Sequence, residues 1–179
     1  EIERAKYPLN PFINAGAIAT TSMVVSKTGD DAFEEILDFV RDICNDPDLY
    51  LDQIIYHSEK RTGNLDRSLA YYMESKNMML GDVVTSLDTY FKQCSMMVTC
   101  QSLANLGAVL ANDGIAPWNN ERIISSEAAT YTKSVMMTTG LYNESGTYSV
   151  RIGIPTKSGV GGVLVSAAPN HYGIGIFSP

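Results

Sequence analysis

The sequence lacks the features that mark several classes of protein. Its 179 residues carry a formal net charge of −7, and no cluster of Lys and Arg offsets it. A nucleic-acid-binding surface is therefore not expected, because such a surface needs gathered positive charge. No apolar run approaches the roughly 18 residues that cross a bilayer. The first residues, "EIERAKYPLN", lack the pattern of a signal peptide. We expect an acidic protein with no nucleic-acid partner and no membrane partner.

Metal-binding and disulfide patterns are also missing. Cys44, Cys94 and Cys100 show no CxxC spacing, and His57 and His171 are far apart in the sequence. A zinc site is therefore not expected, and we expect no metal and no organic cofactor. An odd number of cysteines favours free, buried thiols in a reducing, cytoplasmic location. Each histidine is expected to be a surface or packing residue.

The pattern of apolar residues predicts a helical body. Apolar residues recur at intervals of three and four, which is typical of helices that bury one face. Capping residues support several of these helices, with Asp30 or Asp31 before one and Asp82 before another. The predicted helical segments are 14–26, 30–45, 66–75, 81–94, 97–114 and 125–140.

The last third of the sequence predicts strands instead. Strand-like patterns cover 147–154, 160–168 and 172–177, and Pro155 and Pro169 divide them. Helices followed by antiparallel strands indicate an α+β fold. A short hairpin would not be stable alone, so further strands are expected from outside these residues. We expect residues 1–179 to form a single domain that is incomplete at both ends.

A lysine motif opens one of the predicted strands. Lys157-Ser158-Gly159 fits the K-[ST]-G element of serine acyl-transferases, which also carry S-x-x-K. A glycine-rich strand start with a solvated lysine explains the same three residues. None of the seven lysines follows a serine by three positions. The nucleophile therefore lies outside these residues, or the interpretation is wrong.

Two other stretches carry polar residues of interest. In "PLNPFINAGAIATTS", Asn14 stands at the expected start of a helix, where it can serve as a capping residue. In "YHSEKRTGNLDRSLAYYM", Glu59, Asp66 and Arg67 surround a Gly-Asn turn, which a solvated loop would explain. Taken alone, each stretch favours the plain structural explanation.

Together, however, these stretches resemble a known family. "LNPFINAGAI", "SEKRTG", "DTYFKQCSMMVTCQSLANLGAVLANDG", "GLYNESG" and "PTKSGVGGVLVSAAPN" occur in the order found in the serine-dependent glutaminases. The similarity covers essentially all 179 residues. It implies a fold like that of β-lactamases, transpeptidases and penicillin-binding proteins. It also implies hydrolysis of L-glutamine to L-glutamate and ammonia by a homo-oligomer, a dimer or a tetramer. The family's Ser-x-x-Lys precedes the segment that corresponds to Glu1, and the family's sequences continue past Pro179.

The resemblance also implies roles for individual residues. Asn14 would hydrogen-bond the substrate, and the Glu59 carboxylate would hold its α-ammonium. Tyr90 and Tyr142 match tyrosines that line the pocket, and Tyr142 would transfer a proton near the nucleophile. The backbone N–H of Val160 would contribute to an oxyanion hole.

Two residues depart from the family pattern. Asp66 stands at a substrate-binding position where the family has asparagine, and an ionised aspartate there would repel the substrate α-carboxylate. Val163 replaces a glycine and adds a side chain near the expected oxyanion hole. Two alternatives therefore stay open: a penicillin-recognising serine acylase of the same fold, and a catalytically degenerate member that binds an amino acid. Asn14 and Glu59 argue against the first, and Asp66 favours the second.

Overall fold

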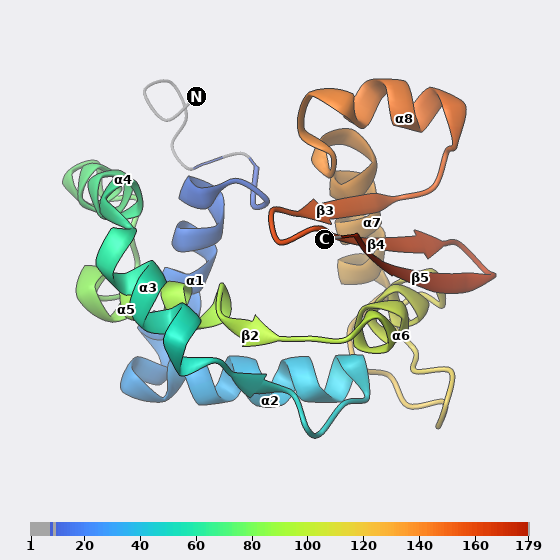
Figure 1. The fold of residues 1–179 in the computed structure, drawn as a ribbon, viewed down its shortest axis with the longest axis horizontal. Coiled ribbons are helices and arrows are strands. Elements are labelled where there is room, and N and C mark those ends of the chain that lie inside the picture. The colour runs from blue at the N-terminus through green and yellow to red at the C-terminus, as the bar shows by residue number, and fades with distance from the viewer. Residues whose placement is uncertain (1–7, 9, 179) are drawn as a thin grey trace. The chain divides into compact units, whose positions relative to one another are not determined.

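The computed structural model describes residue 8 and residues 10–178, which form two compact units (Figure 1). Unit 1 consists of the residues up to Phe39 together with Leu49–Met97. Unit 2 consists of Val40–Asp48 and the residues from Val98 onward. Among the described residues, no helix is long and apolar enough to cross a membrane.

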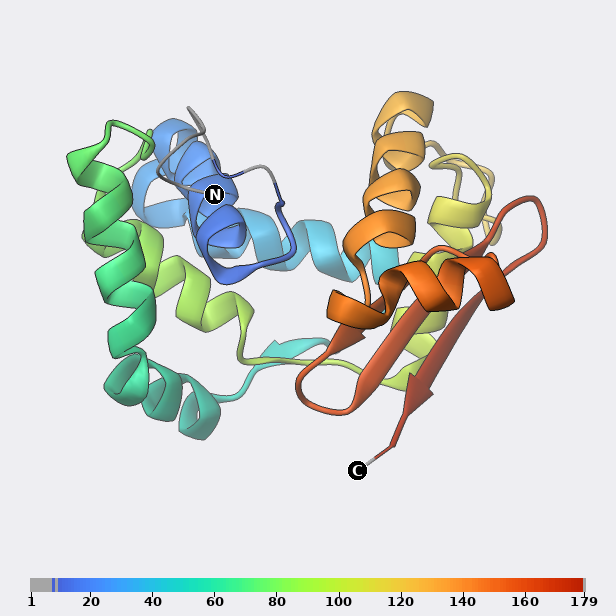
Figure 2. The ribbon, with the colours of Figure 1, turned by 90° about the horizontal axis from the view of Figure 1, so that it is seen from above.

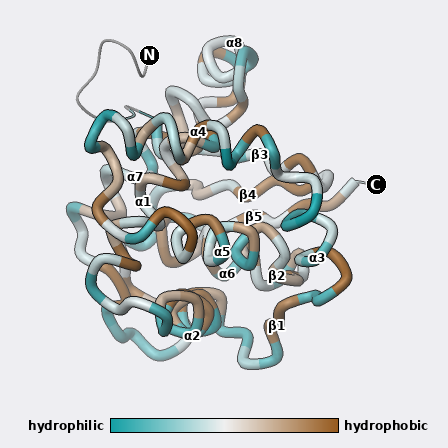
Figure 3. Tube along the Cα trace, turned by 90° about the vertical axis from the view of Figure 1, so that its left-hand side faces the viewer, coloured by the Kyte–Doolittle hydropathy of each residue, from teal (hydrophilic) through white to brown (hydrophobic). Residues whose placement is uncertain are grey.

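Unit 1 is a bundle of helices with one small pair of strands. Its elements are α1 (Asn14–Thr28), a 3-10 turn (Gly29–Asp31), the first part of α2 (Ala32–Cys44), β1 (Tyr50–Leu51), α3 (Gln53–Thr62), α4 (Asn64–Ser75), α5 (Val83–Gln93) and β2 (Met96–Met97). β1 and β2 pair antiparallel. Apolar and hydrophilic residues alternate along α2 (Figure 3), as the spacing of its apolar residues predicts.

The core of unit 1 lies where α1, α4 and α5 meet. Ile18 of α1, Met73 of α4 and Phe91 of α5 are all buried. Burying a side chain of this size contributes about 1.5–3 kcal/mol to folding. Asp82 caps α5 by accepting a hydrogen bond from the Thr85 N–H, as predicted.

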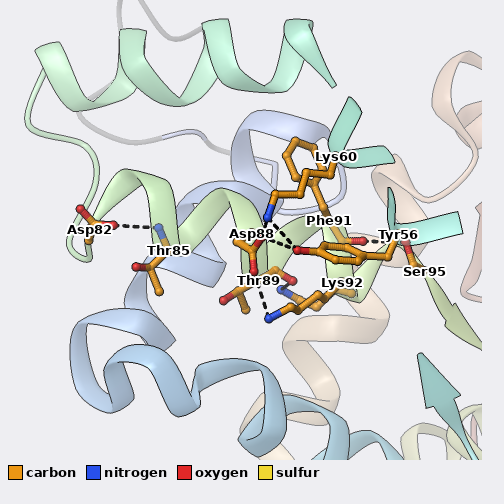
Figure 4. Close-up of polar contacts among 10 residues, drawn as sticks. Tyr56, Lys60, Asp82, Thr85, Asp88, Thr89, Phe91, Lys92 and Ser95 are labelled. Carbon is orange, nitrogen blue, oxygen red and sulfur yellow. Dashed lines mark hydrogen bonds and ion pairs between the residues drawn. The ribbon is translucent and has the colours of Figure 1, made fainter. Parts of the chain in front are cut away.

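A charged cluster joins α3 to α5 (Figure 4). The Asp88 carboxylate accepts hydrogen bonds from the Tyr56 hydroxyl at 2.5 Å and from the Lys60 ammonium at 2.5 Å. Lys92 lies 3.0 Å from its other oxygen. Burial alone would raise the pKa of Asp88, but the bonds from Lys60, Tyr56 and Lys92 outweigh burial and lower it to about 2. Asp88 is therefore ionised at neutral pH and binds the side chains of Tyr56, Lys60 and Lys92.

Unit 2 packs helices on a three-stranded sheet (Figure 2). Its elements are the end of α2, α6 (Cys100–Ala111), α7 (Ser126–Thr139), a 3-10 turn (Tyr142–Glu144), α8 (Ser145–Arg151), β3 (Thr156–Gly159), β4 (Val163–Ala168) and β5 (Tyr172–Phe177). The strand order is β3-β4-β5, and both pairs are antiparallel. The expected α+β arrangement of helices followed by antiparallel strands is confirmed.

Glycines let α6 lie directly on β5. A Cβ added to Gly173 would lie 2.0 Å from the Ala104 carbonyl oxygen, and one added to Gly175 would lie 2.0 Å from the Cys100 carbonyl oxygen. Real Cβ atoms do not approach backbone oxygen this closely. The alternation in "YGIGIF" therefore places bare backbone on the face of β5 that α6 covers.

One predicted strand is wrong. Residues 147–154 were expected to be extended, but Ser145–Arg151 form α8, and the sheet begins only at Thr156. The Ser145 hydroxyl accepts from the Leu141 N–H and donates to the Tyr142 carbonyl oxygen, which fixes the turn that starts this helix. The Ser149 hydroxyl then donates to the Met137 carbonyl oxygen of α7. Tertiary packing on α7 thus prevails over the β-branched and aromatic composition.

Three smaller expectations also differ from the structure. The segment that a solvated loop would explain is helical, because α3 and α4 follow each other with Gly63 alone between them. Asn14 is the first residue of α1 rather than its cap, and Ile13 occupies the cap position without a side-chain hydrogen bond. All three cysteines are free, but Cys44 alone is buried, whereas Cys94 and Cys100 are exposed.

Candidate active site

The first group of predicted site residues lies in unit 1 and begins with Asn14. The loop before α1 packs tightly on the helix, since a Cβ at Gly16 would lie 1.9 Å from the Asn10 carbonyl oxygen. Gly16 therefore permits the close approach that fixes the first turn of α1. From this turn, the Asn14 side-chain amide donates a hydrogen bond to the Asp66 carboxylate at 2.6 Å.

The short link between α3 and α4 places Asp66. A Cβ at Gly63 would lie 2.5 Å from the Phe91 ring, so the link passes directly over a core aromatic residue. Asp66 then falls in the first turn of α4, where a carboxylate is favoured by the helix dipole. The Arg67 side chain does not pair with Asp66. Its guanidinium lies 5.2 Å from the centre of the Phe91 ring and donates to the Lys60 carbonyl oxygen.

Tyr90 belongs to the same group. Its hydroxyl lies near the Cys94 thiol, one helical turn away. Burial raises the pKa of Tyr90, and the thiol of Cys94 and the carboxylates of Asp66 and Glu59 raise it further. Tyr90 therefore stays protonated at neutral pH, and both carboxylates lie within electrostatic reach of its hydroxyl. Glu59 itself is half-buried on α3.

The second group lies in unit 2 and centres on Tyr142. This residue has a φ of 52°, in the left-handed region that costs a non-glycine residue about 1–3 kcal/mol. The Lys157 ammonium lies 5.1 Å from the centre of the Tyr142 ring, a cation–π contact that helps to hold the ring in place. Lys157 also donates to the Ser158 carbonyl oxygen, and burial lowers the pKa of its ammonium. Backbone strain held by a specific contact is typical of functional sites.

Val160 occupies the turn between β3 and β4, where it is 97% exposed. Its backbone N–H donates to no acceptor among the described residues, so it is available to a ligand. The turn is held by Gly162, whose N–H bonds the Gly159 carbonyl oxygen at 3.1 Å and whose carbonyl accepts from the Ser178 N–H. Gly162 has a φ of 90°, which favours glycine at this point of the turn.

The unusual Val163 has a simple packing explanation. It pairs with Gly159 across the β3–β4 ladder, and a Cβ on Gly159 would lie 2.6 Å from the Val163 Cγ2 atom. The valine side chain thus lies where Gly159 has none. The glycine at 159 therefore provides the space that the Val163 side chain occupies.

The predicted residues therefore form two groups. Asn14, Glu59, Asp66 and Tyr90 gather in unit 1, and Tyr142 and Val160 lie in unit 2 with Lys157. Cys94 was not predicted to belong to a site. The signal that could have found it is its spacing, since Cys94 follows Tyr90 by four residues and so lies on the same helical face.

Other cavities and clusters lie apart from these residues. A cavity of about 170 Å³ in unit 1 is lined by residues that include Lys60, Arg67 and Phe91, and one of about 270 Å³ in unit 2 is lined by residues that include Asn112 and His171. Neither is lined by a predicted site residue. Within the described part of the sequence, no three His, Cys, Asp or Glu side chains form a group able to hold a metal ion.

Comparison with known families and proteins gives a consistent result. The family model described as Glutaminase matches residues 1–179. The chain is 56% identical to Glutaminase 1 of Clostridium perfringens (strain 13 / Type A) over 179 residues, which are 100% of this chain and 58% of that protein. It is 45% identical to a glutaminase of Clostridium tetani (strain Massachusetts / E88), again over 100% of this chain and 58% of the relative. The chain thus spans less than two thirds of these relatives' length.

Solved structures agree with the sequence comparison. The chain matches a Bacillus subtilis glutaminase in covalent complex with 5-oxo-L-norleucine, formed by reaction with 6-diazo-5-oxo-L-norleucine, with a TM-score of 0.90 and 33% identity over 95% of this chain and 60% of the other. A probable glutaminase from Bacillus subtilis complexed with 6-diazo-5-oxo-L-norleucine matches with a TM-score of 0.92 and 32% identity, over 100% of this chain and 60% of the other. The expected β-lactamase/transpeptidase-like fold is confirmed.

Proposed function

The chain belongs to the glutaminase family, and on that premise we propose that the whole protein hydrolyses the side-chain amide of L-glutamine to give L-glutamate and ammonia. The observation that best supports the proposal is the match over residues 1–179, together with a structural neighbour that reacts with 6-diazo-5-oxo-L-norleucine. That reagent carries a ketone carbon where glutamine has its amide carbon. A covalent product therefore suggests a nucleophile beside the corresponding atom.

The proposed reaction is acyl transfer in two steps. A serine activated by a lysine attacks the amide carbon, the C–N bond breaks, and nitrogen leaves as ammonia after protonation. Water then hydrolyses the acyl-enzyme and releases glutamate. Because no S-x-x-K occurs in residues 1–179, we propose that another segment supplies both groups, that these residues form one incomplete catalytic domain, and that they are inactive alone.

The residues described here would bind and orient the substrate. Glu59 would pair with the α-ammonium, while Asn14, Asp66 and Tyr90 would surround the amino-acid head group. In unit 2, the Val160 N–H would donate to the developing oxyanion. Tyr142, held beside Lys157, would transfer a proton at the nucleophile or the leaving nitrogen. None of these roles requires a metal or an organic cofactor.

Ammonia release from L-glutamine by the full-length protein tests the proposal. Tyr142→Phe removes the hydroxyl and keeps the ring, so kcat should fall by about 10²–10⁴. Tyr131→Phe is the matched control, since Tyr131 is also an exposed tyrosine of unit 2, and it should leave kcat unchanged. Unchanged turnover in Tyr142→Phe would remove Tyr142 from the mechanism. Absence of ammonia release with retained binding of L-glutamine by calorimetry would favour the catalytically degenerate alternative.

We also propose that the protein is a cytoplasmic homo-oligomer, a dimer or a tetramer, without nucleic-acid or membrane partners. The net charge of −7 argues against a nucleic-acid partner. The free cysteines fit a reducing location, and the family resemblance supports the homo-oligomer. Light scattering of the full-length protein at several concentrations would measure its mass. A monomer at all concentrations would contradict the proposed assembly.

A further inference from the structure

Among the described residues, no cation pairs with the negative charge of the unit 1 group. Glu59 and Asp66 are both acidic, and neither forms an ion pair with any described residue. The described partner of the Asp66 carboxylate is the neutral amide of Asn14. The neighbouring cation, Arg67, is directed to the Phe91 ring and the Lys60 carbonyl oxygen instead. This group is therefore suited to a ligand that brings positive charge and hydrogen-bond donors.

Donors are scarce in the same group. One N–H of Asn14 already bonds Asp66, which leaves its second N–H and the Tyr90 hydroxyl as the side-chain donors of the group. The remaining groups are mostly acceptors: the oxygens of two carboxylates and the Asn14 amide oxygen. A substrate carboxylate placed here would meet like charge and few donors. An amide in its place carries no charge and can donate an N–H to Asp66.

A free amino acid presents both charges on the same carbon. If Glu59 holds the α-ammonium, as the proposed function requires, the α-carboxylate is held close to Asp66. We propose that Asp66 makes the enzyme prefer glutamine whose α-ammonium is free and whose α-carboxylate is masked as an amide, as in L-glutaminamide or the N-terminal glutamine of a peptide. This inference rests on the proposed function and assigns its substrate preference.

The reaction of such a substrate balances without any co-reactant except water. The C–N bond of the γ-amide breaks, the nitrogen leaves as ammonia, and water supplies the hydroxyl of the new carboxyl group. The product is the α-amide of glutamate, or a peptide with N-terminal glutamate. The α-amide itself is not cleaved.

The test compares two substrates with the full-length protein. Values of kcat/KM for L-glutamine and L-glutaminamide are measured at neutral pH, and mass spectrometry identifies which amide was lost. The wild type should favour L-glutaminamide by about tenfold or more, which is the size expected for removing one like-charge contact. Asp66→Asn should lower the KM for L-glutamine by a similar factor and change that for L-glutaminamide little, which abolishes or reverses the preference.

Control variants separate this inference from the proposed function. Asp31→Asn makes the same charge change at the far end of α1, about 20 Å along the helix from Asn14, and should preserve the wild-type ratio. Asp66→Glu keeps the charge and should keep the preference. A wild type that favours L-glutamine would overturn the inference but leave the glutaminase function standing, even if Asp66→Asn fails to fold. Failure to release ammonia from either substrate would overturn the proposed function itself.

Discussion

Different interactions stabilise the interior of each unit. Unit 1 combines an apolar helix core with a charged cluster in which Asp88 is bound by Lys60, Lys92 and Tyr56 (Figure 4). In unit 2, Gly173 and Gly175 let α6 lie against bare strand backbone along β5. Unit 1 also has close approaches at glycine, at Gly16 and Gly63, but these lie at the start of α1 and between α3 and α4 rather than between a helix and a sheet. The charged cluster in unit 1 and the helix–strand contact in unit 2 therefore predict different effects of substitution.

The predicted site groups differ in the same way. The unit 1 group consists of polar side chains, with Asn14 and Asp66 in direct contact. The unit 2 group depends on backbone conformation, with Tyr142 in a left-handed region and the Val160 N–H in a glycine-rich turn. Substitutions should therefore alter substrate recognition through unit 1 and backbone geometry through unit 2.

The largest effect should come from adding one carbon to unit 2. Gly173→Ala places a Cβ about 2 Å from backbone atoms of α6, so the helix and strand must separate. We expect a loss of about 3 kcal/mol or more in the free energy of unfolding, measured by urea denaturation. Hydrogen exchange should become faster mainly at the backbone amides of α6 and β5.

A glycine of the same unit provides the control. Gly146 lies in α8, and a Cβ there would meet no atom within 4 Å. Gly146→Ala should stabilise the protein by about 0.5–1 kcal/mol through helix propensity. If Gly146→Ala and Gly173→Ala lowered the free energy of unfolding equally, the steric explanation for Gly173 would be wrong.

Removing the central charge of unit 1 should have an intermediate effect. Asp88→Asn leaves Lys60 and Lys92 without their shared carboxylate, and we expect a loss of about 2 kcal/mol in the free energy of unfolding near pH 7. The folded pKa of Asp88, about 2, lies below its ordinary value of 3.8. The stabilisation is therefore complete above pH 3.8 and is lost as pH falls toward 2.

The pH dependence distinguishes charge from packing. Urea denaturation of the wild type and Asp88→Asn from about pH 7 to about pH 3 should show the difference between the two stabilities shrinking below pH 3.8, without vanishing at pH 3. A constant difference across this range would mean that Asp88 acts through shape alone. The charge of Asp88 would then not be what stabilises unit 1.

The smallest effect should come from a helix cap in unit 2. The Ser125 hydroxyl accepts a hydrogen bond from the Ala128 N–H at 3.0 Å and so caps α7. Ser125→Ala should cost about 1 kcal/mol, measured as a shift of the thermal midpoint. Ser126→Ala, one residue into the helix, is the matched control and should change the midpoint less. A loss near that of Gly173→Ala would mean that capping matters as much as close packing here.

The sequence predicts much of this structure because local signals and tertiary packing agree along most of its length. Lys157-Ser158-Gly159 was expected to open a strand, but it lies at the end of β3, and β4 begins only at Val163. The helices ending near Cys44 and Ala111, the Asp82 cap and the strand over 172–177 all follow from local patterns. α8 does not, since its residues favour strand and its start depends on the Ser145 hydroxyl and packing against α7. Local propensity cannot report such contacts.

For the candidate site, the sequence named residues but could not describe their interactions. The Asn14–Asp66 hydrogen bond joins residues 52 positions apart, so no local pattern contains it. The Lys157–Tyr142 contact likewise depends on how β3 lies beside the turn before α8. Both residues of each pair were named in advance, and their pairing required the structure.

The contact between Gly159 and Val163 has a consequence for how this protein can change over generations. Because a Cβ at residue 159 would lie only 2.6 Å from the Val163 Cγ2 atom, the residues acceptable at one position depend on the residue at the other. A larger residue at 159 becomes acceptable only after residue 163 has become smaller, so the order of mutations matters. In a relative with glycine at the position of Val163, this clash is absent, so a larger residue could replace Gly159 directly.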